Sequence, residues 1–198
     1  YETIQIGDQL WMAENLKVTH YNDGSEIPIG YSDSEWIQLE TGAYAVYPTD
    51  EDYESQTTCG DDCADIYGNL YNWYAVDDDR GLCMDGWHIP SDEDWTILTD
   101  YLGGESVAGG KMKEEGLVHW NSPNTEATNE SGFTGLPAAL RSSWNGNYLY
   151  MGNYGYFWSS SEDGSDHPWL RGLSYNDFDL VRDYSAKQGG FSIRCLGD

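Results

Sequence analysis

Apolar and polar positions alternate in two short runs within residues 3–18, TIQIGDQLWMAENLKV. Ile4 and Ile6 stand two residues apart, and the same spacing recurs in the second run, which is the period of a β-strand. A Gly-Asp pair between the runs is typical of a tight turn. The pattern predicts an antiparallel β-hairpin near the start, with Trp11 on the face opposite to its two neighbours.

Residues 66–76, IYGNLYNWYAV, are apolar and aromatic near the spacing of a helix. We expect a first helix here, and a strand is the alternative for a run of this length. The preceding residues, 19–65, have no sustained periodicity, so we expect a long irregular loop region.

A second helix is predicted after Pro90. Ser91 has the character of an N-cap, and Asp94 stands three residues on as its capping-box partner. Apolar residues then recur at helical spacing until the Gly pair at 103–104, which ends the helix. His88, just before this helix, lies in a short extended piece and is expected to be structural.

The C-terminal third, from about residue 130, has short β-type runs separated by Gly, Asn and Ser turns, as in a meander. The chain has no internal repeat or low-complexity linker. We therefore expect one domain over residues 1–198, with strands and a few helices rather than a repetitive array.

The strongly acidic composition of the chain limits its possible partners. The chain has 35 acidic and 9 basic residues, a net charge of -26, and a mean hydropathy of -0.65. A phosphate backbone or an anionic membrane surface needs Lys and Arg, so nucleic acid and anionic lipid are poor partners. No apolar run approaches the roughly 18 residues of a membrane span, so membrane insertion is not expected either.

The four cysteines, an even number, fit an oxidising compartment. Cys59 and Cys63 bracket a small loop that a disulfide would close, which leaves Cys83 and Cys195 for a long-range bridge. A four-cysteine zinc site is the alternative. Because the chain starts at Tyr1, we expect a mature secreted chain or an excised domain.

Acidic side chains gather around the small cysteine loop, and they suggest calcium as the cofactor. Asp61, Asp62 and Asp65 are the candidate ligands, because hard cations require several converging oxygen atoms. A second acidic run lies at residues 77–79. A solvated acidic loop is the alternative in both places.

Six segments in order resemble the Fibrobacter succinogenes major paralogous domain family, which is bacterial and extracellular: IGDQLWMAENL, YGNLYNWYAV, GLCMDGWHIPSDEDWTIL, GFTGLPAALR, GYFWSSSE and GGFSIRC. The resemblance extends from about residue 1 to residue 198. It implies an α+β, C-type lectin-like fold similar to that of the formylglycine-generating enzymes. Such a fold has two helices, a mostly antiparallel twisted sheet and long irregular loops. It also implies a Cys83–Cys195 disulfide, in agreement with the pairing expected from spacing.

The lectin-like resemblance directs attention to the loop region of residues 120–158, which is dense in aromatic side chains interleaved with Asn and Gly. Aromatic faces stack on sugar rings, and amide side chains bond to sugar hydroxyls. We therefore expect a non-catalytic extracellular binding or adhesion domain, secreted or at the cell surface, that recognises carbohydrate or another surface polymer. The candidate ligand-binding residues are Trp144, Asn145, Asn147, Tyr148, Tyr150, Tyr154 and Tyr156.

Two other functions are open. The first is a self-assembling structural subunit of a fibre, tube or surface layer, in which the N-terminal strand pairs with another copy. The second, weaker alternative is an oxidase similar to formylglycine-generating enzymes. That chemistry needs a reactive cysteine pair, and no catalytic residues stand out, so we do not expect an enzyme.

Overall fold

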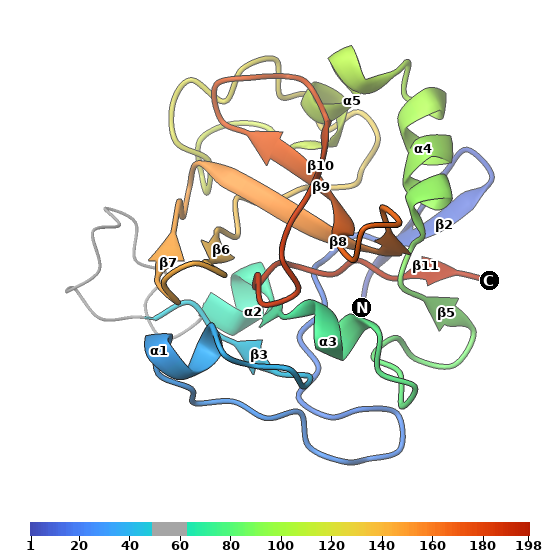
Figure 1. The fold of residues 1–198 in the computed structure, drawn as a ribbon. Helices are drawn as coiled ribbons and strands as arrows, with labels where there is room; N and C mark the ends of the chain where they lie inside the picture. Colours follow the sequence, from blue (N-terminus) through green and yellow to red (C-terminus); the bar gives the residue numbers. More distant parts are fainter. Residues whose placement is uncertain (49–62) are drawn as a thin grey trace.

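The computed structural model describes residues 1–48 and 63–198, and these form a mixed α+β structure with small antiparallel sheets (Figure 1). The helices are α1 (Asp33–Trp36), α2 (Cys63–Tyr67), α3 (Trp73–Val76), α4 (Asp92–Tyr101) and α5 (Glu105–Met112). The strands are β1 (Thr3–Ile6), β2 (Gln9–Met12), β3 (Tyr44–Ala45), β4 (Leu70–Tyr71), β5 (Trp87–His88), β6 (Leu140–Arg141), β7 (Tyr148–Leu149), β8 (Tyr154–Glu162), β9 (Pro168–Ser174), β10 (Val181–Tyr184) and β11 (Leu196–Gly197). The predicted α+β class is confirmed.

The two ends of the chain meet in one four-stranded sheet, of order β1-β2-β11-β5 (Figure 1). The predicted hairpin is present, with Ile4 paired to Trp11 across a turn in which Gly7 has a φ of 59°. Trp11 and Met12 are both buried, because opposite faces of β2 contact different hydrophobic clusters.

A second sheet, of order β10-β9-β8, confirms the predicted C-terminal meander. The last segment is less regular than predicted. Phe191 and Ser192 form single bridges to Tyr71 and Phe157, and only β11 is a paired strand. The segment is extended, but its partners change from one residue to the next.

The helix predicted over 66–76 is wrong, because α2, β4 and α3 divide this segment. Gly68, which follows the last residue of α2, has a φ of 75° and ends the helix. A Cβ at this position would lie 2.8 Å from the Leu16 carbonyl oxygen. The Asn72 side chain then accepts from the Ala75 N–H at 3.2 Å and starts α3. Such side-chain bonds to the backbone compete with a continuous helix.

The second predicted helix is α4, and its capping box is present. Ser91 Oγ accepts from the Asp94 N–H at 3.2 Å, and the Asp94 carboxylate accepts from the Ser91 N–H at 2.9 Å. The glycine pair follows the helix end as predicted. The sequence analysis missed α5, since two central glycines argue against a helix; a Cβ on Gly109 would lie 2.2 Å from the Asp179 carbonyl oxygen.

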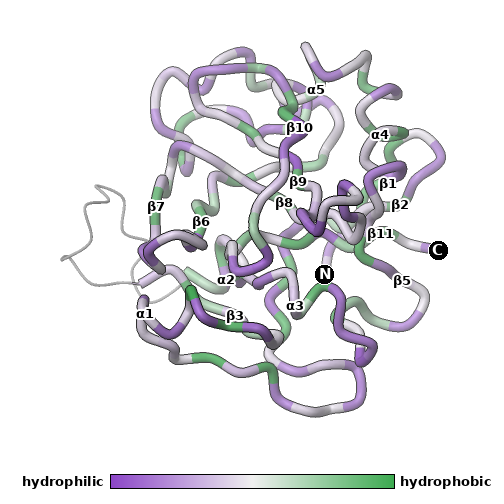
Figure 2. The backbone as a smooth tube through the Cα atoms, viewed as in Figure 1, coloured by the Kyte–Doolittle hydropathy of each residue, from purple (hydrophilic) through white to green (hydrophobic). Residues whose placement is uncertain are grey.

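Strand β8 separates two hydrophobic clusters. Phe157 packs with Trp11 and Trp95 on one face, whereas Trp158 packs with Phe191 on the other. In Figure 2 apolar and polar stretches are interspersed along the backbone, and the strands differ in burial: β10 is exposed throughout, whereas β9 is buried at all but one position.

The Cys83–Cys195 disulfide belongs to the second of these clusters, and its prediction is confirmed. Cys63 is also disulfide-bonded, while Cys59, its expected partner, lies outside the described residues.

Arg194 lies at the centre of the fold with no exposed surface. Its guanidinium donates to Asn15 Oδ1 at 2.7 Å and to the carbonyl oxygens of Met12, Phe133 and Thr134. Burial lowers the pKa of Arg194 to about 9. One side chain therefore joins the N-terminal hairpin, the loop at residue 133 and the last strand segment.

A second buried arginine, Arg171 on β9, meets the start of α4. Its Nη2 lies 2.9 Å from the Asp92 carboxylate, and Arg182 on β10 lies 2.8 Å from the same carboxylate. Burial opposes ionisation of Asp92, but hydrogen bonds from Arg182 and Arg171 outweigh it, so the Asp92 pKa is lowered. The pair fixes α4 against the β10-β9-β8 sheet.

Candidate functional site

Tyrosines from the predicted site form a continuous row on one face of β8 and in the turn before it. The Tyr154 and Tyr156 rings are near-parallel, with an interplanar angle of 11° and centroids 5.7 Å apart. Tyr150 lies edge-on to Tyr154 at 5.3 Å, and it is 49% exposed. The row ends against Phe191, whose ring centroid is 5.5 Å from that of Tyr156.

Strand alternation explains why these rings share one face. Tyr154 and Tyr156 are two residues apart, whereas Gly155 and Phe157 point to the buried side. Gly172 stands opposite Tyr156 in the ladder, and a Cβ there would lie 3.1 Å from the Tyr156 ring. The glycine therefore leaves space for the ring to lie over β9.

Tyr175 belongs to the same row, with its ring 6.4 Å from that of Tyr154 and edge-on to it. The sequence analysis missed it because it follows the next strand, beyond residue 158. The register of β8 and β9, which pairs Tyr154 with Ser174, brings it there.

The phenol of Tyr156, at the centre of the tyrosine row, is uncharged near neutral pH. Burial raises the pKa of Tyr156 to about 12, with further contributions from Tyr154, Tyr150 and Asp183. A neutral phenol both donates and accepts one hydrogen bond or more, and its ring is an apolar surface. This combination suits a ligand with hydroxyl groups and apolar C–H faces.

Trp144 is the most exposed large apolar side chain among the described residues, at 88%. It lies in the turn between β6 and β7, whose backbone is held by its own side chains. Ser142 Oγ accepts from the Trp144 N–H at 3.1 Å, and the Gly146 N–H donates to the Ser142 carbonyl oxygen at 3.0 Å. The indole is thus exposed on an ordered turn.

The remaining three predicted residues, of which Asn145 is exposed, bond or pack within the turn and against the residues next to it. Asn145 Oδ1 accepts from the Asn147 N–H at 3.1 Å within the turn. The Asn147 carbonyl oxygen accepts from the Ser142 N–H at 2.8 Å. Tyr148 packs edge-on against Tyr47 at 5.4 Å. The structure therefore brings Tyr150, Tyr154 and Tyr156 together and uses these three residues to shape the adjoining turn.

Arg141 holds this turn from the buried side. The sequence analysis did not identify it as part of the candidate site. It is 3% exposed and lies between the Trp36 and Tyr148 rings, at 4.3 and 4.9 Å. Its Nε donates to the Gly146 carbonyl oxygen at 3.0 Å. An arginine within the apolar run GLPAALR was the available signal.

The calcium prediction falls mostly outside the described residues, which do not include Asp61 and Asp62. Asp65 is exposed, and its carboxylate lies 3.9 Å from Lys17 Nζ. In the second acidic run, Arg80 bonds Asp78 at 2.7 Å. Over residues 1–48 and 63–198, no group of three or more His, Cys, Asp or Glu side chains is placed to hold a metal ion. Calcium binding stays a prediction.

His88 has the structural contacts expected for it. Its Nδ1 lies 2.7 Å from Asp198 Oδ1, and its Nε2 lies 3.5 Å from the Asp94 carboxylate. The ring therefore joins the chain end to the capping box of α4.

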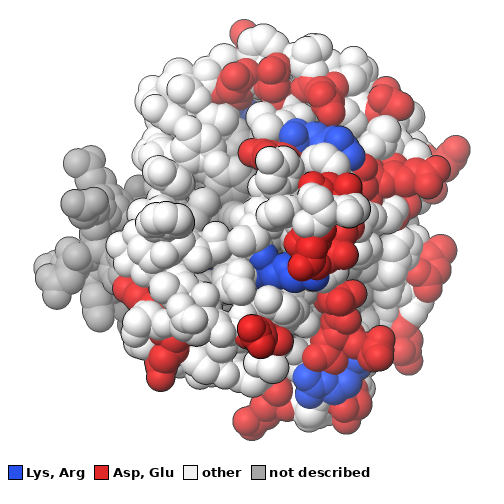
Figure 3. Space-filling view, viewed as in Figure 1, with Lys and Arg blue, Asp and Glu red and all other residues white. Residues whose placement is uncertain are grey.

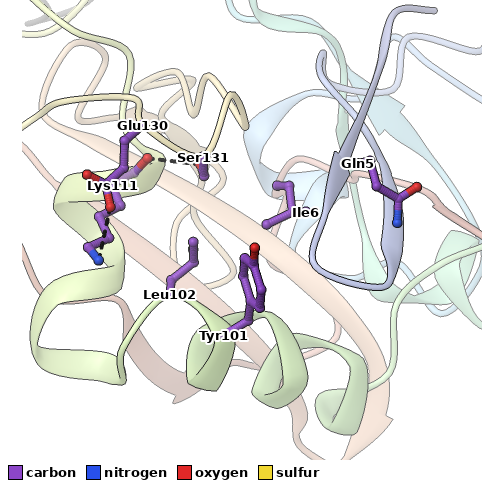
Figure 4. Close-up of a pocket in the computed structure, with 7 residues that line it drawn as sticks. All are labelled: Gln5, Ile6, Tyr101, Leu102, Lys111, Glu130 and Ser131. Carbon is purple, nitrogen blue, oxygen red and sulfur yellow. Dashed lines mark hydrogen bonds and ion pairs between the residues drawn. The ribbon is translucent and has the colours of Figure 1, made fainter.

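A separate pocket of about 350 Å³ lies between the N-terminal hairpin, α4 and α5 (Figure 4). Tyr101 and Leu102 form one wall, and the ion pair between Lys111 and Glu130, at 3.0 Å, forms another. None of the predicted ligand-binding residues lines it.

Comparison with protein families identifies the chain. Residues 4–196 match the Fibrobacter succinogenes major domain, so the chain belongs to this family. The search of curated proteins gives no match. The search of solved structures also gives none. In the described part of the chain, no helix has both the length and the apolar character needed to cross a membrane.

Proposed function

We propose that this domain is a non-catalytic extracellular binding module that recognises carbohydrate or another surface polymer through Trp144 and the tyrosine row. The observation that carries the proposal is the exposure of Trp144 on a turn whose backbone is already hydrogen-bonded. At protein interfaces, the residues that dominate the binding energy are enriched in tryptophan, tyrosine and arginine. A fixed turn loses little conformational freedom when a ligand binds, which favours affinity.

The tyrosine row is the second part of the proposed binding surface. Its rings supply flat apolar area, and its phenol groups supply hydrogen bonds without charge. Sugar rings present the complementary features, since they have C–H faces and hydroxyl edges.

We further propose a C-type lectin-like architecture and an extracellular location. Two features support them: the Cys83–Cys195 bond, which joins the segment after α3 to the last strand, and the pairing of β2 with β11. Disulfides persist in oxidising compartments, which supports a secreted or surface-exposed chain.

Binding to a panel of immobilised polysaccharides tests the proposal. We expect binding by the full chain, and at least tenfold weaker binding, about 1.4 kcal/mol, for Trp144→Ala and for Tyr154→Ala. Tyr101→Ala is the matched control, because Tyr101 is 64% exposed but lies on α4, outside the row. Unchanged binding by both site variants, or loss of binding by the control alone, would overturn the assignment.

Self-assembly is the second candidate, and one observation favours it. β1 is an outer strand of its sheet, and Thr3 and Gln5 are exposed along it. An outer strand has backbone groups available for pairing with another chain. Light scattering and negative-stain microscopy, with and without Ca²⁺, test this; regular assemblies that disappear when Gln5 is replaced by Pro would support it, and a monomer in both conditions would exclude it.

A further inference from the structure

The basic side chains of this protein are all engaged within the molecule. Five form ion pairs at the surface, and each lies 3.5 Å or less from an acidic partner: Lys17 with Glu14, Arg80 with Asp78, Lys111 with Glu130, Arg182 with Asp92, and Lys187 with both Glu162 and Asp166. The other four are buried or nearly so: Lys113, Arg141, Arg171 and Arg194. These nine account for every Lys and Arg of the sequence.

The buried cations are held mainly by backbone oxygen atoms. Lys113 Nζ donates to the carbonyl oxygens of Thr125, Ser174 and Asp177 at 2.9, 2.9 and 2.7 Å. Arg141 and Arg194 are bonded in the same way to the backbone. Their charge is therefore unavailable to a ligand at the surface.

The surface that remains is acidic. In Figure 3 most carboxylates lie over the right-hand part of the visible face and along its edges, and the few basic groups lie beside them. Near the proposed site, burial is the main cause of the raised pKa of Tyr156, and the negative charge of Asp183 adds a smaller contribution. β10 pairs Val181 with Gly172, the residue beneath the Tyr156 ring, and Asp183 follows two positions further along β10, so strand alternation puts both side chains on the face that carries the row.

From these observations we infer that the ligand is an uncharged polysaccharide, and that this surface rejects polyanions such as acidic polysaccharides. The inference rests on the proposed function and names its ligand class. A carboxylate or sulfate near the row would meet Asp183 without a free cation to balance it, and like charges in close contact suppress the wrong partner. The negative charge of the surface does not weaken the binding of a neutral, hydroxylated polysaccharide, because stacking and neutral hydrogen bonds need no counter-charge.

Polysaccharides compared in matched pairs test the inference. The probes are cellulose, xylan, mannan and dextran, each with its carboxymethylated derivative, with a chelator present so that Ca²⁺ cannot bridge carboxylates. At about 0.01 M salt, where the Debye length is about 30 Å, we expect at least one neutral member to bind at least tenfold more tightly than its derivative. At about 1 M salt, where the length is about 3 Å, the difference should shrink severalfold, while neutral binding stays nearly constant.

The Asp183→Asn variant locates the effect. The amide keeps an oxygen acceptor for the Tyr184 N–H, which the carboxylate now binds at 2.9 Å. We expect this variant to bind the carboxymethylated partner more tightly and the neutral partner unchanged, whereas Asp100→Asn, an exposed change on α4, should alter neither.

The outcomes separate the two proposals. Equal or tighter binding of the carboxymethylated member at low salt would overturn the inference and leave a polymer-binding function in place. Failure of both members of all pairs to bind would overturn the proposed carbohydrate function itself.

Discussion

The buried framework around Arg194 and the aromatic surface around Trp144 use the same kinds of side chains for opposite purposes. In the framework, Trp11, Trp95 and Arg194 have no exposed surface, and the polar groups are paired internally. On the surface, Trp144 is 88% exposed, and the neighbouring turn satisfies its own backbone.

The difference shows which motif residues explain stability and which can explain recognition. The Gly-Trp-x-x-Pro-Ser stretch and the Arg-Cys near the end form the capping box, the disulfide and the central guanidinium. These contacts lie inside the molecule, so these two motifs explain the stability of the fold and not the binding of a ligand. The proposed recognition therefore depends on side chains that the framework leaves exposed.

Removal of the Cys83–Cys195 bond should have the largest effect on the framework. The bond spans 112 residues, and loop-closure entropy assigns it about 4 to 5 kcal/mol. Urea denaturation of the Cys83→Ser, Cys195→Ser double variant measures the loss in free energy of unfolding. A loss below about 1 kcal/mol would mean that the rest of the framework already restrains the unfolded chain.

Arg194→Met should come next. Met fills similar volume, but it leaves Asn15 Oδ1 and the Met12 and Thr134 carbonyl oxygens without their donor. Unpaired buried polar groups lead us to expect a loss of about 3 to 5 kcal/mol, measured by chemical denaturation. Arg182→Met, which changes a more exposed arginine, is the control and should cost less.

Asp92→Asn should give an intermediate, pH-dependent loss of about 2 kcal/mol, the range of hydrogen bonds to charged groups, because the amide removes the charge that Arg171 and Arg182 face. The folded-state pKa of Asp92 lies below its unfolded value, so its contribution is fully present above the unfolded pKa of about 3.9 and is lost as pH falls through the lower folded pKa. Thermal or urea unfolding of wild type and variant between pH 7 and pH 2 measures the difference. A difference that does not change with pH would contradict the ion-pair account.

Ser91→Ala should reduce stability by about 1 kcal/mol, because the α4 N-terminus loses the acceptor for the Asp94 N–H. Ser106→Ala, at an exposed position of α5, is a suitable control. Because Ala has a higher helix propensity than Ser, Ser106→Ala should not destabilise α5, and an equal loss in both variants would contradict a specific capping role for Ser91.

Trp144→Ala should have the smallest effect on folding, within about 0.5 kcal/mol, since the side chain has few contacts. Trp158→Ala, a change to a buried indole, should instead cost about 3 to 5 kcal/mol. Denaturation of the two variants compares surface and framework directly. A large loss for Trp144→Ala would mean that the turn depends on the indole.

Local patterns made part of the fold predictable from the sequence. The hairpin and the α4 capping box depend on residues within a few positions of one another, and both predictions are confirmed. The prediction of a helix over 66–76 was wrong because Asn72 and Gly68 make contacts with segments distant in the sequence: Asn72 with Ala43, and Gly68 with Leu16. Helix α5 was missed because its glycines are explained only by the close approach of residue 179.

The sequence predicted which residue types the candidate site contains, but not which of their side chains point inward and which face solvent. An aromatic-rich loop was visible, yet the inward packing of Tyr148 depends on Tyr47, about a hundred residues earlier in the chain. Tyr175 joins the row only through the pairing of β8 with β9. Sequence spacing does not contain these tertiary relations.

The most direct test of this separation is a parallel measurement on the Trp144→Ala, Tyr154→Ala double variant. Its free energy of unfolding and its binding to the polysaccharide panel should be determined with the same preparation. The account predicts a stability within about 1 kcal/mol of wild type and the loss of polysaccharide binding. Retained binding in a stable variant would contradict the assignment of recognition to the aromatic surface.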